Sequence, residues 1–181
     1  MIVRQATEAD AKALAAIYGD AVLYGFGTFE EVPPSAADMD ARRRAVQDQG
    51  LPYLVAEVDG EVLGFAYAAP FRPRAAYRYT LEDSVYVSPA ARGKGIGRAV
   101  LSAVIAACEA LGVRQLMAVI GDSGNDSSIG LHRAVGFEQT GVGKSVGFKH
   151  GRWVDIVHMQ KPLNGGDARL PDAPGITLTG H

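Results

Sequence analysis

The residues best suited to chemistry lie in a short basic stretch with three alternating glycines, Arg92-Gly-Lys-Gly-Ile-Gly-Arg98. Because glycine has no side chain, the backbone can approach an anion closely, and the N–H groups that open a helix point at it with the positive end of the helix dipole. Arg92, Lys94 and Arg98 add positive charge. We therefore expect residues 92–98 to bind a diphosphate.

The spacing of these glycines narrows the kind of diphosphate. A dinucleotide-binding loop follows the pattern GxGxxG, whereas the third glycine of this loop comes one position early. A Walker loop needs Ser or Thr after its lysine to hold magnesium, but Gly95 follows Lys94. The plain alternative is a glycine-rich turn with two surface arginines. The strand-like run that precedes the loop, Val85-Tyr86-Val87-Ser88-Pro89, weighs against that alternative.

The elements that must position this loop follow from the apolar pattern of the chain. Asp59-Gly60 is typical of a two-residue hairpin turn between two strands. The order of elements predicts an α/β fold, with a mixed sheet that carries helices on its faces. Strands are predicted at residues 2–5, 51–58, 61–71, 80–87, 115–120, 137–148 and 152–160, and helices at 8–24, after Ser35, from the glycine loop to Gly112, and at 127–134.

Helical spacing also predicts which side chains are buried. The helix after Ser35 is rich in arginine and is expected to be mostly solvated. Two other helices carry apolar residues at helical spacing, and these are expected to face the core: Ala13, Leu14, Ile17, Ala21 and Tyr24 in the first, and Ile96, Val100, Val104, Cys108 and Leu111 in the second.

Composition limits the number of domains and the classes of partner. The chain has 181 residues, 48% of them hydrophobic, which suits one compact domain. We place that domain at residues 1–163 and expect residues 164–181, which offer little to bury, to form a flexible tail. The net charge is -2 and the basic residues are scattered, so the footprint of a nucleic-acid-binding protein is missing.

Metal centres, disulfides and membrane segments are not expected either. Cys108 is the single cysteine, and the four histidines lack the spacing of metal ligands. No apolar run approaches the roughly 20 residues that span a bilayer, and the first residues lack the order of a signal peptide. We expect a cytoplasmic protein with no membrane partner.

Longer motifs extend the pattern around the glycine loop. The run VYVSPAARGKGIGRAVL resembles the acyl-CoA binding motif of the GNAT superfamily of N-acetyltransferases. Four further stretches, TFEEVPPS, PFRPRAAYRYTLEDSVYV, AVIGDSGNDSSIGLHRAVGF and VGFKHGRWVDIVHMQ, resemble the branch that acetylates phosphinothricin and methionine sulfoximine, some members of which are linked to herbicide resistance. The resemblance covers nearly the whole chain up to Leu163. It implies a mixed, mostly antiparallel central sheet flanked by helices, with acetyl-CoA as co-substrate.

The resemblance also implies roles for individual residues. Glu82 corresponds to the general base, often acting through water, and an ion pair with Arg72 or Arg78 is the structural alternative. Val87 N–H is the candidate donor to the thioester oxygen. His132 stands where the superfamily commonly has a tyrosine acid, and it either protonates the thiolate, orients the amine or merely packs in its helix. The implied cofactor contacts are Val85, Tyr86, Val87, Arg92, Gly93, Lys94, Gly95, Ile96, Gly97, Arg98, Asn125 and Ser128.

An acceptor with a carboxylate and a second polar head would suit arginine forks. The resemblance places a substrate loop just before Glu82, and it implies a homodimer. Two alternatives stay open: a transferase for another primary amine, such as a polyamine, an aminoglycoside or a protein amino terminus, and a non-catalytic acyl-CoA sensor. Asp83 is expected on the strand face opposite Glu82, so the two should not act as a pair. The implied acceptor contacts are Phe29, Arg72, Arg74, Tyr77, Arg78 and Glu82, with Trp153 as a further possible wall.

Overall fold

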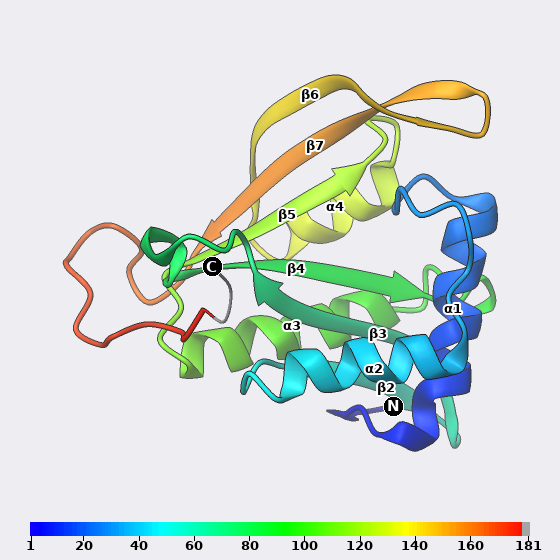
Figure 1. Cartoon of the computed structure of the whole chain (residues 1–181), viewed down its shortest axis with the longest axis horizontal. Coiled ribbons are helices and arrows are strands. Elements are labelled where there is room, and N and C mark those ends of the chain that lie inside the picture. Colours follow the sequence, from blue (N-terminus) through cyan, green and yellow to red (C-terminus); the bar gives the residue numbers. More distant parts are fainter. Residues whose placement is uncertain (179–181) are drawn as a thin grey trace.

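A seven-stranded sheet forms the centre of the computed structural model, which describes residues 1–178 (Figure 1). The spatial order of its strands is β1-β2-β3-β4-β5-β7-β6. All neighbours run antiparallel except β4 and β5, so the mixed, mostly antiparallel sheet predicted above is confirmed. The strands are β1 (Ile2–Gln5), β2 (Tyr53–Val58), β3 (Glu61–Pro70), β4 (Thr80–Val87), β5 (Gln115–Gly121), β6 (Glu138–Lys149) and β7 (Arg152–Pro162).

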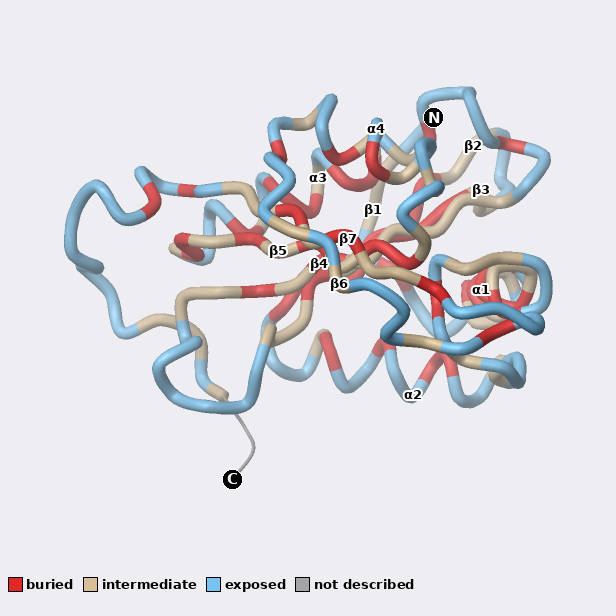
Figure 2. Tube along the Cα trace, turned by 90° about the horizontal axis from the view of Figure 1, so that it is seen from above, coloured by how far each residue is buried: buried red, intermediate tan, exposed pale blue. Residues whose placement is uncertain are grey.

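Helices cover both faces of the sheet. α1 (Ala11–Tyr24) and α2 (Ala36–Gln47) lie on one face, while α3 (Ile96–Ala110) and α4 (Asp126–Ala134) lie on the other, as Figures 1 and 2 show together. Short 3-10 turns precede α1 at Glu8–Asp10, β4 at Ala75–Tyr77 and the glycine loop at Pro89–Ala91. Buried residues concentrate between the sheet and these helices (Figure 2).

Local signals in the sequence explain where several elements begin. Ser35 and Asp38 form a capping box at the start of α2: Ser35 Oγ accepts from Asp38 N–H at 3.1 Å, and Asp38 Oδ2 accepts from Ser35 N–H at 2.9 Å. Asp59 and Gly60 both have positive φ, 52° and 83°, so the predicted hairpin turn between β2 and β3 is confirmed. Thr7 and Asp10 begin the first helix as predicted, although its first three residues are 3-10 rather than α.

Two predicted buried faces need correction. In α1, Leu14 and Ile17 are buried as expected, but Tyr24 is 78% exposed and Tyr18 and Val22 lie inside instead. Tyr18 can enter the core because its hydroxyl has polar partners there, which a sequence pattern of apolar residues does not reveal. Leu111 is also exposed, because it follows the last residue of α3.

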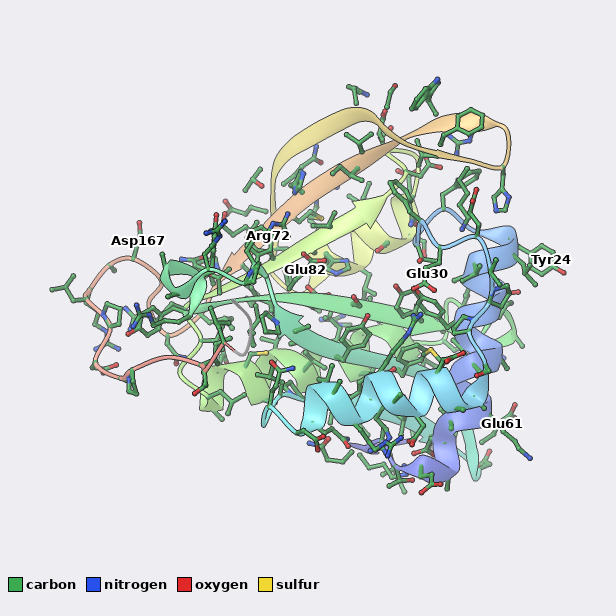
Figure 3. The ribbon with its side chains drawn as sticks, viewed as in Figure 1. Tyr24, Glu30, Glu61, Arg72, Glu82 and Asp167 are labelled. Carbon is green, nitrogen blue, oxygen red and sulfur yellow. The ribbon has the colours of Figure 1, made fainter. Side chains whose placement is uncertain are left out.

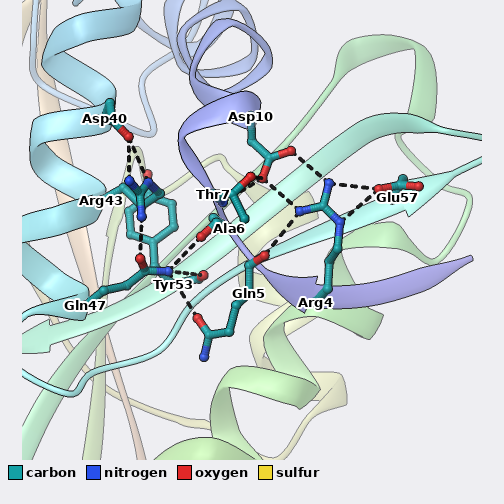
Figure 4. A network of polar contacts seen from close by, with 10 residues as sticks. All are labelled: Arg4, Gln5, Ala6, Thr7, Asp10, Asp40, Arg43, Gln47, Tyr53 and Glu57. Carbon is teal, nitrogen blue, oxygen red and sulfur yellow. Dashed lines mark hydrogen bonds and ion pairs between the residues drawn. The ribbon is translucent and has the colours of Figure 1, made fainter.

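The arginine-rich helix α2 is less solvated than predicted. Arg43 is buried and donates from Nε to Asp40 at 2.9 Å, and it also bonds to Gln47, whose amide reaches Ala6 O at 2.9 Å (Figure 4). A second network beside it joins Arg4 to Asp10 and Glu57. Buried ions persist when they are paired in this way. Together the two networks tie α2 and the first residues of the chain to β2.

Cys108 lies in the buried face of α3, fully enclosed, and burial raises the pKa of its thiol to about 12. A thiol in such surroundings is inert, because the thiolate is the reactive form. Its predicted role in core packing is confirmed. Among residues 1–178, no helix combines the length and the apolar character needed to cross a membrane.

Residues 164–178 form neither helix nor strand, and hydrogen bonds hold them against the end of the sheet. Arg114 donates from Nε to Gly166 O at 2.9 Å, Tyr79 OH donates to Ala173 O at 2.6 Å, and Ile176 N–H donates to Arg78 O at 2.9 Å. This segment therefore contacts the loop that leads into β4. Its flexibility stays a prediction, and the last predicted tail residues, 179–181, lie outside the described part of the chain.

Candidate active site

A cleft of about 570 Å³ opens where β4 and β5 separate. The two parallel strands pair from Thr80 with Gln115 to Asp83 with Ala118, and β4 then continues to Val87 without pairing to β5. The N–H of Ser88 donates to Leu63 O at 2.9 Å on the β3 side. Because successive N–H groups of a strand point to opposite edges, the N–H of Val87 faces the opening. Val85, Tyr86 and Val87, three of the predicted cofactor contacts, all line this cleft.

The glycine loop closes one end of the cleft. Gly93 and Gly95 have φ values of 75° and 81°, which L-residues with a side chain rarely adopt, and Gly95 is the residue that precedes the first turn of α3. The first N–H groups of a helix have no partner within it, so those of α3 are available to an anion. A Cβ on Gly97 would lie 3.1 Å from the side chain of Leu131, which explains the third glycine. The residues present fit a diphosphate.

The three basic residues of the loop differ in their positions. Arg98 lines the cleft, and Arg92 lines it too while it donates to Asp20 of α1 at 3.1 Å. Lys94 is exposed and does not line the cleft, so its expected contact with the pyrophosphate stays a prediction. Gly93, Gly95, Ile96 and Gly97 complete this end of the cleft.

The start of α4 forms the opposite wall. Asn125 Oδ1 accepts from the Ser128 N–H at 3.2 Å, and Asn125 Nδ2 donates to Gly121 O at 3.3 Å. Asn125 therefore caps α4 and ties it to the end of β5. Asn125 and Ser128, two of the predicted cofactor contacts, line the cleft.

Glu82 lies on the α1 and α2 side of β4, half-buried, with Arg72 Nη1 at 3.8 Å from its carboxylate. Burial raises the pKa of Glu82, the charge of Arg72 opposes this, and the neighbouring Asp83 adds to it. A carboxylate with a raised pKa is a better proton acceptor near neutral pH. The predicted ion pair with Arg72 exists, but the side chain of Arg78 bonds to Ala75 O instead.

Asp83 points to the other face of the sheet, as strand alternation predicts, and meets His132 of α4 there. His132 Nε2 lies 3.0 Å from Asp83 Oδ2, and His132 Nδ1 lies 2.7 Å from Ser128 O. Both side chains are almost fully buried and both line the cleft. Burial raises the pKa of Asp83, and the opposing effect of His132 is smaller. Burial by itself would lower the pKa of His132, but the hydrogen bonds to Asp83 and Ser128 and the charge of Asp83 together raise it. Sequence reasoning missed this pair.

The loop between α1 and α2 packs across β6 and β7. Lys149, almost fully buried, donates from Nζ to Thr28 O at 2.8 Å. Gly147 leaves room for the ring of Phe29, because a Cβ there would lie 2.3 Å from that ring. Glu30 accepts from Tyr18 and Arg42. In the view of Figure 3, Glu30 and Arg72 lie on either side of Glu82.

The remaining predicted acceptor residues do not converge on Glu82. Arg74 is exposed, and Tyr77 packs edge-on against Phe71, with ring centroids 5.7 Å apart. Trp153 is 63% exposed and packs against Phe148 on the β6–β7 hairpin, away from the cleft. Among the predicted arginines in the described residues, Arg72 alone forms an ion pair with Glu82.

The family model of the acetyltransferase (GNAT) family matches residues 15–137. The chain belongs to the GNAT family of acetyltransferases. It is 58% identical over 170 residues to phosphinothricin N-acetyltransferase of Alcaligenes faecalis, covering 94% of this chain and 86% of that protein. It is 44% identical to the L-methionine sulfoximine/L-methionine sulfone acetyltransferase of Pseudomonas paraeruginosa, covering 90% and 94% of the two chains.

Solved structures of this family share the fold. The phosphinothricin acetyltransferase of Sinorhizobium meliloti, crystallised in complex with acetyl-CoA, superposes with a TM-score of 0.92 at 50% identity, over 96% of this chain and 94% of that chain. The GNAT fold predicted from the glycine loop is therefore confirmed, and the chain is an N-acetyltransferase by family.

Proposed function

We propose that this GNAT enzyme transfers the acetyl group of acetyl-CoA to the amine of a small amino-acid-like acceptor of the phosphinothricin, methionine sulfoximine or methionine sulfone type. One observation carries the proposal. The cleft between β4 and β5 has the anion-binding glycine loop at one end, and β4 also carries Glu82, a candidate base, on the face opposite Asp83 and His132. The names of the relatives support the acceptor class.

The protein's part in binding the co-substrate follows from the cleft. The N–H groups at the start of α3, with Arg98, would hold the pyrophosphate, and residues 84–87 would pair with the pantetheine arm as a neighbouring strand does. When bound, acetyl-CoA supplies an activated thioester. Val87 N–H would stabilise the negative charge that develops on the carbonyl oxygen.

Glu82 would remove a proton from the acceptor ammonium, because only the neutral amine attacks a thioester. Its raised pKa suits that task, and its partial exposure admits the water through which a base often acts. Arg72 is the candidate for the acceptor carboxylate, since its guanidinium stacks over Phe71 at 4.2 Å and remains half-exposed. Phe29, Arg74, Tyr77 and Arg78 stay weaker candidates for acceptor contact.

The test is release of free thiol from acetyl-CoA by the purified protein, with methionine sulfoximine, phosphinothricin, a polyamine and an amino-terminal peptide offered in parallel. We expect turnover with the first two, and a kcat at least about 100-fold lower for Glu82→Gln. Glu61→Gln is the matched control, because Glu61 is exposed at the hairpin turn, far from Glu82 in Figure 3. Turnover with only the polyamine or only the peptide would overturn the proposed acceptor class in favour of that amine. Tight binding of acetyl-CoA without turnover of any amine would favour a non-catalytic acyl-CoA sensor.

We also propose a homodimer and a cytoplasmic location. Support for the dimer comes from β6, which is an edge strand, and from the exposed apolar side chains of Val146, Phe148 and Trp153 on the β6–β7 hairpin. Unpaired edges and contiguous apolar surface are typical of contact sites between protein chains.

A further inference from the structure

The buried pair of Asp83 and His132 is not used by the proposed chemistry of Glu82. It lies at the last residue pair that joins β4 to β5, where Asp83 opposes Ala118, so it marks the closed end of the cleft. Asp83 and His132 are 5% and 2% exposed. The other carboxylate oxygen, Asp83 Oδ1, is buried and has no hydrogen-bond partner among the described residues.

The geometry fixes how many protons this pair holds. Ser128 O is a carbonyl and can only accept, so His132 Nδ1 must carry a hydrogen. The 3.0 Å contact between His132 Nε2 and Asp83 Oδ2 needs one further proton, on either atom. The neutral pair therefore stores one transferable proton beside the cleft. Losing that proton would leave a net negative charge in a buried place.

Other titratable groups near the pair are poorly suited to give up a proton. Burial, with a smaller effect from the charge of Asp83, raises the pKa of the Cys108 thiol on α3 to about 12. Glu82 on β4 points to the opposite face. Within the cleft, burial raises the pKa of Tyr86 well above its usual value, and a hydrogen bond from Arg152 lowers the pKa of Asp122, which stays ionised. Arg92 and Arg98 bring positive charge to the same cleft.

We propose that Asp83 is a positioning residue that keeps His132 protonated, so that His132 supplies the proton for the thiolate leaving group. This inference rests on the proposed acetyl transfer. The amine nitrogen bonds to the thioester carbon, the C–S bond breaks, and its electron pair stays on sulfur. The Nε2–H of His132 leaves its hydrogen bond with Asp83 Oδ2 and passes its proton to that sulfur, forming the free thiol. Neutral His132 and ionised Asp83 remain, and they recover a proton from solvent, while Glu82 releases the amine's proton to solvent.

Asp83→Asn is a sharp test, because the amide keeps the shape and can donate to His132 Nε2 while Nδ1 still donates to Ser128 O. The hydrogen bonds are preserved, but His132 becomes neutral. We expect kcat to fall by about 100-fold, with the KM for acetyl-CoA changed less than about twofold. In the wild type, kcat falls as pH rises through the pKa of the pair; in the variant this alkaline limb disappears. Asp83→Glu should restore part of kcat.

Asp10→Asn is the matched control. Asp10 is 5% exposed, is paired with Arg4 and does not line the cleft, so this variant loses a buried charge without touching His132. It should keep kcat and its alkaline limb. Equal kcat and equal pH profiles for wild type and Asp83→Asn would overturn the inference, whereas absence of turnover in the wild type would remove the proposed function and this inference together.

A second readout does not depend on activity or on the folding of a variant. Nitrogen-15 chemical shifts of the wild-type His132 ring at neutral pH distinguish an imidazolium from a neutral ring. Two protonated nitrogens support the inference. A single protonated nitrogen shows that Asp83 does not hold His132 charged, and it overturns the proposal.

Discussion

At the scale of single residues, Arg72 sets how well Glu82 accepts a proton. Burial raises the pKa of Glu82, and Arg72 works against this. A base must be ionised, so activity is lost as pH falls through that pKa. Arg72→Met removes the opposing charge, and we expect the acidic limb of kcat/KM to move to higher pH.

The control for this prediction lies in the same loop. Arg74 is exposed and has no ion pair with Glu82 within residues 1–178, so Arg74→Met should leave the acidic limb in place. The pH dependence of kcat/KM with saturating acetyl-CoA measures both variants. An unchanged acidic limb in Arg72→Met would show that Arg72 does not influence the pKa of Glu82. The role of Arg72 would then be confined to binding the amine substrate.

Contacts between side chains that are distant in the sequence could not be predicted at this scale. Alternation along one strand placed Glu82 and Asp83 on opposite faces, and the structure confirms it. The partner of Asp83 comes from a helix 49 residues later, and no local pattern predicts such a contact. Both ring nitrogens of His132 have partners in the structure. The sequence could not show these contacts, so it left the three proposed roles of His132 undecided.

At the scale of elements, the glycine loop depends on backbone conformations that side chains oppose. Gly95 has a φ of 81°, so Gly95→Ala should cost about 1 kcal/mol of stability. The added methyl would stand in open space at the cleft, where the pyrophosphate is proposed to bind. We expect the KM for acetyl-CoA to rise about tenfold, the equivalent of 1.4 kcal/mol of binding.

Gly50 provides a comparison for Gly95. It has a φ of 73°, lies beyond the end of α2, and would bring a Cβ into open space. Gly50→Ala should lower stability by a similar amount, measured by urea unfolding, without changing the KM for acetyl-CoA. If both variants shift KM alike, the loop effect is a general loss of stability rather than a local one.

Turns and periodicity predicted the elements well because they are local. The hairpin at Asp59-Gly60, the capping box at Ser35 and the strand before the glycine loop all depend on residues close in sequence. Sheet order is different, because β7 inserts between β5 and β6 through pairing over long separations. The early end of pairing between β4 and β5, which creates the cleft, likewise has no sequence pattern of its own.

At the scale of the whole molecule, the β6–β7 hairpin carries apolar surface that residues 1–178 of the same chain leave exposed. Trp153 is 63% exposed and Phe148 is 58% exposed, and the two rings pack edge-to-face with centroids 5.4 Å apart. Large aromatic side chains are enriched at the centre of protein interfaces. We therefore expect light scattering after size exclusion to give the mass of a dimer.

The variant Trp153→Asp places a charge in that surface and should yield a monomer, because burying an unpaired carboxylate is costly. Tyr24→Asp is the matched control: Tyr24 is 78% exposed at the end of α1, outside the hairpin, and its replacement should leave the dimer intact. A wild-type protein that stays monomeric at every concentration up to its solubility would show that this surface serves another contact. Because Phe29 packs on Gly147 of the same hairpin, a dimer formed there would also brace the loop between α1 and α2 that carries Phe29 and Glu30.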